Sequence, residues 1–185
     1  SVSAEIELGN NDITWGAVSM KGIKLGVEYG SADLLNSDFS YTHTWLVCDY
    51  FFNTLFRRRI LPVTLNLRLK AGMIDGNAPV QKLGFLDGRL SSCTPYGTFR
   101  TLNRGQVGSD TYAALFWEHN FRTIPFELLG LRGLAENGLS ILVHGASGRT
   151  WLSDTYTGMD FLPSYPFLDL EWYHEIGVSL SGILE

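Results

Sequence analysis

Apolar and polar residues alternate along several segments of the chain, most clearly in residues 63–73. In this run, Val-Thr-Leu-Asn-Leu-Arg-Leu-Lys-Ala-Gly-Met, every second residue is apolar and those between are mostly polar. Because successive side chains of a strand point to opposite faces, the pattern predicts a strand with one apolar and one charged face. Its length matches the roughly 9–11 residues with which a tilted strand crosses the hydrocarbon of a bilayer.

The same alternation recurs along the chain and predicts an all-β fold. We expect an antiparallel meander of seven strands, with an eighth if residues 13–19 pair separately. The expected strands are about residues 2–9, 22–31, 39–50, 62–74, 110–122, 139–152 and 172–184. Phe116 is the one residue that interrupts the alternation of its strand. The fold class that we predict is a partial transmembrane β-barrel.

The connections between these strands differ in length. The link around residues 36–38 is tight, 51–61 and 123–138 are moderate, and 75–109 and 153–171 are long. If the long loops are external, the two moderate links fall on the periplasmic side. Aromatic residues gather near the strand ends, as interfacial girdles require, although core aromatics of a soluble barrel are the alternative. They are Tyr50, Phe51, Phe52, Phe56, Phe121, Phe126, Trp151, Trp172 and Tyr173.

Composition narrows the class of protein. The net charge of −5 argues against nucleic acid as a partner, because phosphate binding needs a basic surface. No run approaches the ~18 apolar residues of a membrane helix. Glycine makes up 20 of 185 residues and often falls inside strands, which favours a curved sheet. We expect residues 1–185 to be a single partial barrel domain that is a piece of a longer protein.

Polar side chains of the expected strands share one face and would line the lumen. They are Glu5, Glu7, Lys24, Glu28, Asn66, Arg68, Lys70, Glu118, Glu175 and Ser179. We further predict that the loop 75–109 folds into the lumen, where Arg100 and Arg104 pair with carboxylates such as Glu118, since an unpaired charge in a narrow pore is costly. Two solvated loop arginines are the alternative. The candidate binding residues are Arg68, Lys70, Arg100, Arg104, Glu118 and Asn120.

Motifs for catalysis are weak. The run His-Gly-Ala-Ser-Gly at 144–148 lacks the Gly-x-Ser-x-Gly spacing of a nucleophile elbow, so Ser147 is not predicted to be a nucleophile. Glu118 and His119 are neighbours along a strand and would point to opposite faces. With no serine, histidine and acid on one face, we expect no enzyme.

Metal, cofactor and disulfide signals are equally sparse. His43, His119, His144 and His174 fall on four expected strands without metal-ligand spacing, and we predict neither a metal site nor a cofactor. Cys48 and Cys93 could form a disulfide, but two unrelated thiols are favoured. The basic run at 57–59 either caps a turn with solvated charge or pairs with lipid phosphates.

Three segments carry a family resemblance: residues 69–72, residues 108–121 with their Ser-Asp-x-Tyr and Glu-His-x-Phe motifs, and residues 124–129 with Ile-Pro. They resemble the C-terminal barrel of a large Bacteroidota outer-membrane family, whose members carry a carboxypeptidase regulatory-like domain followed by a barrel domain of unknown function. That barrel is similar to the surface-antigen barrels of the outer-membrane assembly superfamily. The resemblance implies an outer-membrane location and no peptidase activity.

These observations favour a non-enzymatic outer-membrane segment that contributes to transport, outer-membrane assembly or surface display. Its expected partners are outer-membrane lipid and other outer-membrane proteins. The alternative is a soluble lipocalin-like barrel that binds a small apolar ligand. In that case the alternation is inverted, and Val63, Leu65, Leu67 and Leu69 surround a cavity.

Overall fold

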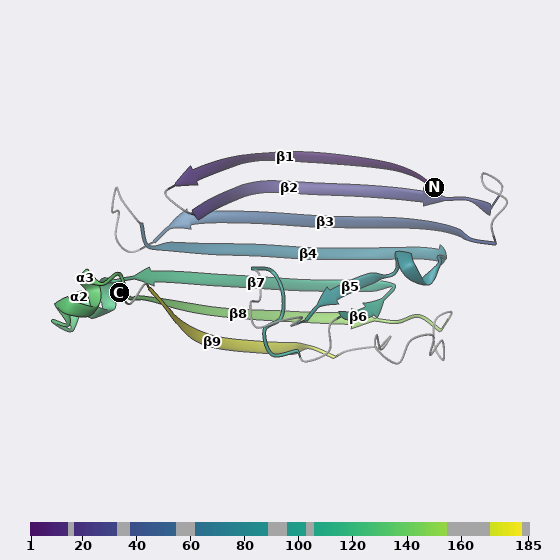
Figure 1. Cartoon of the computed structure of the whole chain (residues 1–185). Coiled ribbons are helices and arrows are strands. Elements are labelled where there is room, and N and C mark those ends of the chain that lie inside the picture. Colours follow the sequence, from purple (N-terminus) through teal and green to yellow (C-terminus); the bar gives the residue numbers. More distant parts are fainter. Residues whose placement is uncertain are drawn as a thin grey trace.

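The main feature of the structure, a computed structural model, is one large antiparallel sheet (Figure 1). The structure describes residues 1–14, 17–32, 38–54, 62–88, 96–102, 106–154 and 171–182. The sheet has seven strands in the order β1-β2-β3-β4-β7-β8-β9, with β1 and β9 at its two edges. The strands are β1 (Val2–Thr14), β2 (Ala17–Gly30), β3 (Ser40–Asn53), β4 (Thr64–Asn77), β7 (Thr111–Arg122), β8 (Ser140–Trp151) and β9 (Tyr173–Ser181). The predicted all-β antiparallel meander is confirmed, whereas the sheet itself is open.

Strand β1 and strand β2 are longer than predicted. Their pairing continues to Thr14 and Ala17, so the described part of residues 13–19 extends the first hairpin and forms no eighth strand. The prediction stopped at residue 9 because Gly9, Asn10 and Asn11 end the alternation. Backbone hydrogen bonding between antiparallel strands does not require alternation, and it carries the hairpin further.

Short elements within the connections were not predicted. The β4 to β7 connection contains the 3-10 helix η1 (Val80–Lys82) and a second, two-stranded sheet of β5 (Gly84–Asp87) and β6 (Gln106–Ser109). The β7 to β8 connection contains α2 (Ile124–Leu128) and α3 (Arg132–Glu136). Proline in the first turn of α2 suits a helix start, and Gly130 and Gly138 follow the two helices with a φ of +73°. No helix among the described residues is long and apolar enough to cross a membrane.

The two ends of the sheet carry different connections. β1 and β3 end, and the two helices lie, at one end of the sheet, whereas β4 and β8 end at the other (Figure 1). The predicted grouping of moderate and long loops is therefore confirmed. Which end faces which compartment stays a prediction.

Strand register sorts the side chains onto two faces. The polar residues predicted to share a face do so: Lys24 lies opposite Glu7, for example, and Asn66 lies opposite Glu118. We call this side of the sheet the polar face. The other side, the apolar face, carries exposed aliphatic residues on β1, β2, β4, β7 and β9. Exposed examples are Ile6 (61%), Leu25 (43%), Leu69 (40%), Leu115 (42%) and Ile176 (75%).

Several residues depart from the side or exposure that the pattern predicts. Val63 precedes β4 and is fully buried, and its carbonyl accepts a hydrogen bond from the Thr54 amide. Among the predicted girdle aromatics, Phe126 is buried in α2, Phe51 lies opposite Asn66 on the polar face, and Tyr173 packs beneath a loop. Tyr50 and Trp172 are exposed near opposite ends of the sheet, as predicted; Phe56 lies outside the described residues.

Glycines inside the strands make room for aromatic rings. A Cβ at Gly26 would lie 2.0 Å from the ring of Trp45 on the neighbouring strand, and a Cβ at Gly145 would lie 2.7 Å from the ring of Trp117. Neither distance is possible without displacing the ring. These glycines therefore let a large side chain lie flat against the sheet, which is one reason for glycine in a strand interior.

Candidate functional site

The described parts of residues 78–110, which we call the inward loop, fold back over the polar face of the sheet. Figure 1 shows β5 and β6 lying over β7 and β8. Leu86 and Phe99 of this loop form a buried cluster with Ala114, Phe116 and Ala146 of the sheet. This cluster explains why Phe116 interrupts the alternation of its strand, because its ring is covered by protein on an otherwise polar side. The described parts of the loop therefore lie on the polar face; that this face lines a lumen stays a prediction.

Phe99 is the centre of the buried cluster. Its side chain is fully buried, its ring centroid lies 5.0 Å from that of Phe116, and it meets Tyr173 edge to face at 5.4 Å. A Cβ at Gly148 would come within 2.6 Å of the Phe99 ring, so glycine on β8 leaves the space that the ring fills. The loop therefore has an apolar core of its own on this face.

Arg68 connects three parts of the site. Its Nε and Nη2 donate to the two carboxylate oxygens of Asp49, at 2.6 and 3.1 Å, and its Nη1 donates to the Tyr96 carbonyl at 3.2 Å. The guanidinium also lies 5.0 Å from the centre of the Tyr96 ring. Two-point pairing of guanidinium with carboxylate is strong and directional, so Arg68 fixes the loop to β3 and β4. Asp49 was missed, because strand 39–50 alternates only weakly.

Lys70 holds the neighbouring part of the loop. Its Nζ donates to the Gly97 carbonyl at 3.0 Å, lies 3.5 Å from a carboxylate oxygen of Asp87, and lies 5.6 Å from the centre of the Phe116 ring. Both predicted cations of β4 are therefore engaged by the inward loop.

Arg100 pairs with Glu118, as predicted, and its Nη1 also donates to the Ser179 hydroxyl at 3.3 Å. The alternative, a solvated Arg100, is wrong because only a quarter of its side chain is exposed. Arg104 lies outside the described residues, so its predicted pairing stays a prediction.

Glu175 on β9 binds the backbone of the loop. Its carboxylate accepts hydrogen bonds from the Arg100 amide at 2.8 Å, the Thr101 amide at 2.9 Å and the Thr101 hydroxyl at 2.7 Å. Thr101 also lies 2.6 Å from the Tyr173 hydroxyl. The predicted polar residue Glu175 is therefore an acceptor for a loop turn as well as a charge on the polar face.

A third anchor joins η1 to the sheet. Lys82 donates to Glu28 at 2.7 Å, and the Tyr41 hydroxyl donates to the same carboxylate at 2.9 Å. The hydrogen bond to Glu28 raises the pKa of Lys82. Burial raises the pKa of Tyr96 in the loop, whose hydroxyl has no hydrogen-bond partner among the described residues. Both side chains therefore keep their protons at neutral pH.

Asn120 is the one described candidate that does not join this network. Its side-chain oxygen accepts from the Arg122 amide at 2.9 Å, at a bulge near the end of β7 where Arg122 has a φ of 57°. It shapes the strand end. Arg68, Lys70, Arg100 and Glu118 are the candidates that the structure brings together.

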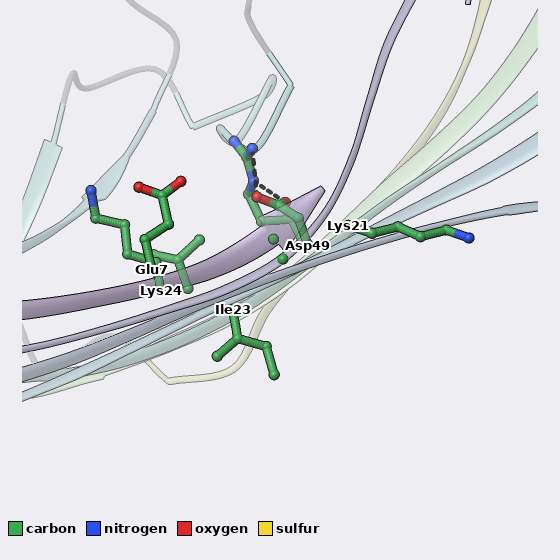
Figure 2. Close-up of a pocket in the computed structure, with 9 residues that line it drawn as sticks. Glu7, Lys21, Ile23, Lys24 and Asp49 are labelled. Atoms are coloured by element: carbon green, nitrogen blue, oxygen red, sulfur yellow. Dashed lines mark hydrogen bonds and ion pairs between the residues drawn. The ribbon is translucent and has the colours of Figure 1, made fainter. Parts of the chain in front are cut away.

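The part of the polar face that the inward loop leaves uncovered forms a depression of about 530 Å³. Its polar lining includes Glu7, Lys24, Asp49 and Arg68. Figure 2 shows Glu7, Lys24 and Asp49 on one side of the ribbons, with Ile23 pointing away on the other. Lys24 pairs with Glu5 at 2.7 Å. The depression is therefore lined by charges of both signs.

Ser147 and His174 form a hydrogen bond that was not foreseen. They are cross-strand partners on the apolar face, with Oγ and Nδ1 2.8 Å apart, and the His174 ring is stacked 6.1 Å from Trp172. Only strand register reveals such a pair. Among the described residues no carboxylate hydrogen-bonds to His174, because the adjacent Glu175 points to the polar face. The pair lacks the acid of a catalytic triad.

The other histidines and Cys48 add no further site in the part of the chain that the structure describes. The four histidines lie on β3, β7, β8 and β9, and Glu118 and His119 point to opposite faces, as predicted. The described residues contain no group of three potential metal ligands. Cys48 is half-buried on the apolar face, while Cys93 and the basic run at 57–59 lie outside the described residues.

Changing Glu175 to glutamine should loosen the loop turn at Arg100 and Thr101. The glutamine amide has one acceptor oxygen where the carboxylate has two, and it carries no charge to strengthen the remaining hydrogen bonds. We therefore expect the free energy of local opening to fall by about 1–3 kcal/mol. Amide hydrogen exchange at Arg100 and Thr101 measures it. Glu7→Gln is the matched control, because Glu7 has the same charge on the same face and lines the depression that the loop leaves uncovered. Unchanged exchange in Glu175→Gln would contradict this role.

No protein-family model matches the chain, and none of the curated proteins matches it.

Proposed function

We propose that this chain is a segment of an outer-membrane β-barrel whose apolar face contacts lipid and whose polar face, partly filled by the inward loop, lines the lumen. Its role is transport, outer-membrane assembly or surface display, without catalysis. One observation carries the proposal. Large apolar side chains stay exposed on the same face of the sheet from β1 to β9, and examples are Ile6, Leu25, Leu69, Leu115 and Val178.

The energetic argument rests on the size of that apolar face. Burying apolar surface contributes about 25 cal/mol per Å², and soluble monomers rarely expose continuous apolar patches beyond a few hundred Å². A face that spans seven long strands exceeds such a patch. Acyl chains would cover it across the whole sheet, and the apolar alternation has the length that a bilayer requires.

The polar face supports the same reading. Its charges meet partners in the inward loop, as in the pairs Arg100 with Glu118 and Lys82 with Glu28. A barrel interior filled in part by a loop offers such partners while leaving a watery remainder. The resemblance to the Bacteroidota barrel family agrees with an outer-membrane location.

The lipocalin-like alternative needs the opposite arrangement. It would place the leucines of β4 around an enclosed apolar cavity, but the covered side of β4 carries Arg68 and Lys70 and the leucine side includes the exposed Leu69. The alternative is kept as an outcome of the experiment.

The full-length protein in detergent should migrate differently on a gel with and without boiling, because closed membrane barrels resist unfolding until heated. Lipid contact is then measured with single-cysteine variants, after Cys48 and Cys93 are changed to serine. A fluorescent label at Val178→Cys should be quenched by brominated lipid, whereas the same label at Glu7→Cys on the polar face should not. Equal quenching at the two sites, or a monodisperse protein without detergent, would refute the proposal.

A further inference from the structure

A small polar cluster interrupts the apolar face near one end of the sheet. Arg149 and Ser147 lie on β8, His174 lies on β9, and all three belong to the apolar face by register. Trp151 and Trp172 flank them. Much of the rest of this face carries aliphatic side chains such as Leu25, Leu69 and Leu115, so a charged residue here is a local exception that the proposed barrel has to explain.

Arg149 is the charged member of the cluster. Its guanidinium lies 5.0 Å from the centre of the Trp151 ring. Its Nε is buried and has no hydrogen-bond partner among the described residues. Arg149 is only half-buried, and an anion that reaches the Nη atoms of its guanidinium would give this cation of the apolar face a counter-charge.

An apolar groove begins beside this arginine. It has a volume of about 380 Å³, and Trp151 forms one wall. The other apolar-face lining comes from β3, β4 and β7, where small side chains lie between larger ones: Thr44, Leu46, Ala71, Met73, Thr111 and Ala113. Ala71 and Ala113 are direct cross-strand partners, and Ala113 is also the partner of Arg149. Trp151, whose ring lies beside the guanidinium, and Ala113 both line the groove, so the groove ends next to Arg149.

We propose that this surface binds a lipid with an anionic phosphate headgroup, with an acyl chain in the groove and the phosphate on Arg149. The inference rests on the proposed membrane location. A guanidinium matches the geometry of a phosphate, and an apolar groove of this width suits a hydrocarbon chain. Ser147 and His174 add hydroxyl and imidazole groups beside the headgroup.

The position of Arg149 along its strand agrees with a headgroup. Arg149 is close to Trp151, the last residue of β8, and at about 3.3 Å per residue it lies roughly 7 Å from the strand end. Arginine near the end of a membrane strand can reach the interface, and tryptophan is favoured at the same depth. A phosphate of the adjoining leaflet lies at that level.

The test compares two brominated lipids in bilayers that contain the full-length protein. The label is placed in the groove at Thr44→Cys, in the background without other cysteines. At equal mole fraction, brominated phosphatidylglycerol should quench this label with about fivefold higher apparent affinity than brominated phosphatidylcholine, the preference expected for one basic residue near an anionic lipid. In Arg149→Gln the two lipids should quench equally, whereas Arg149→Lys should keep most of the preference.

Two controls separate the possible failures. Lys21→Gln removes a cation that lies near Tyr50 at the opposite end of the sheet, and it should leave the preference at Thr44 unchanged. A label at Val178→Cys should be quenched by both lipids without preference. If both lipids quench the label at Val178, but the label at Thr44 shows no preference for the anionic lipid, this inference alone is overturned. That result comes from the protein with Arg149 intact, so it does not depend on whether an Arg149 variant folds. Absence of quenching at Val178 would overturn the membrane proposal, and this inference with it.

Discussion

Replacing Phe99 with alanine should lower the free energy of unfolding by about 3–5 kcal/mol, because the change removes a buried ring and leaves a cavity. Phe99 is fully buried between Phe116 and Tyr173. Its backbone amide donates to the Asp87 carbonyl at 2.9 Å, so the same residue also ties the two halves of the inward loop together. We therefore expect the loop to release from the polar face before the sheet unfolds.

Denaturant unfolding of the lipid-reconstituted protein measures the total effect, and amide hydrogen exchange at Leu86 and Gly97 reports release of the loop. Phe39→Ala is the matched control, because Phe39 is 38% exposed and its truncation leaves little cavity. If Phe99→Ala and Phe39→Ala had equal effects, the cluster around Phe99 would not be what holds the loop.

Replacing Glu118 with glutamine should cost about 2–3 kcal/mol, since it leaves the Arg100 guanidinium without its counter-charge. The cost should stay below that of a fully buried pair, because 15% of the Glu118 side chain and 25% of the Arg100 side chain are exposed. A double-mutant cycle with Arg100→Gln should give a coupling energy of about 1–3 kcal/mol. Unfolding midpoints of the two single variants and the double variant supply the measurement.

The pair of Lys24 and Glu5 is the control for this cycle. Both of its side chains are 41% exposed, and water screens such a pair. Its coupling should be too small to resolve. A cycle on Arg100 and Glu118 that also showed no coupling would mean that the loop is held by its apolar cluster alone.

The assignment of side chains to faces could be predicted because it depends only on the period of a strand. Once residues 64–77 form a strand, Asn66, Arg68 and Lys70 must share one face and Leu67 and Leu69 the other. The same rule placed the neighbours Glu118 and His119 on opposite faces of the sheet. It also identified Phe116 as an apolar residue on the polar face, although nothing in the pattern predicted which side chains would cover its ring.

The short elements could not be predicted in the same way. Strand β5 and strand β6 have too few residues to show a period, and they pair only because the inward loop doubles back over the sheet. The helices α2 and α3 are also too short for a helical pattern to be recognised. The helical conformation of these short segments depends on contacts with the rest of the fold more than on intrinsic helix propensity.

Contacts between distant residues were the least predictable part of the site. The pairing of Arg100 with Glu118 was foreseen from charge alone, since a cation on a covered face needs a partner. Asp49 with Arg68, Glu175 with the loop amides and Ser147 with His174 were not foreseen, because each depends on the register of two strands or on the path of the loop.

The sequence by itself determined an all-β meander with one apolar and one polar face, because successive side chains of a strand point to opposite faces of the sheet. The tertiary structure decided which side became covered. The inward loop packs Phe99 and Leu86 onto the polar face and provides partners for charged side chains there. The aliphatic side chains of the apolar face stay exposed. Packing of this kind depends on how the inward loop folds back over the sheet, and no local sequence pattern predicts that.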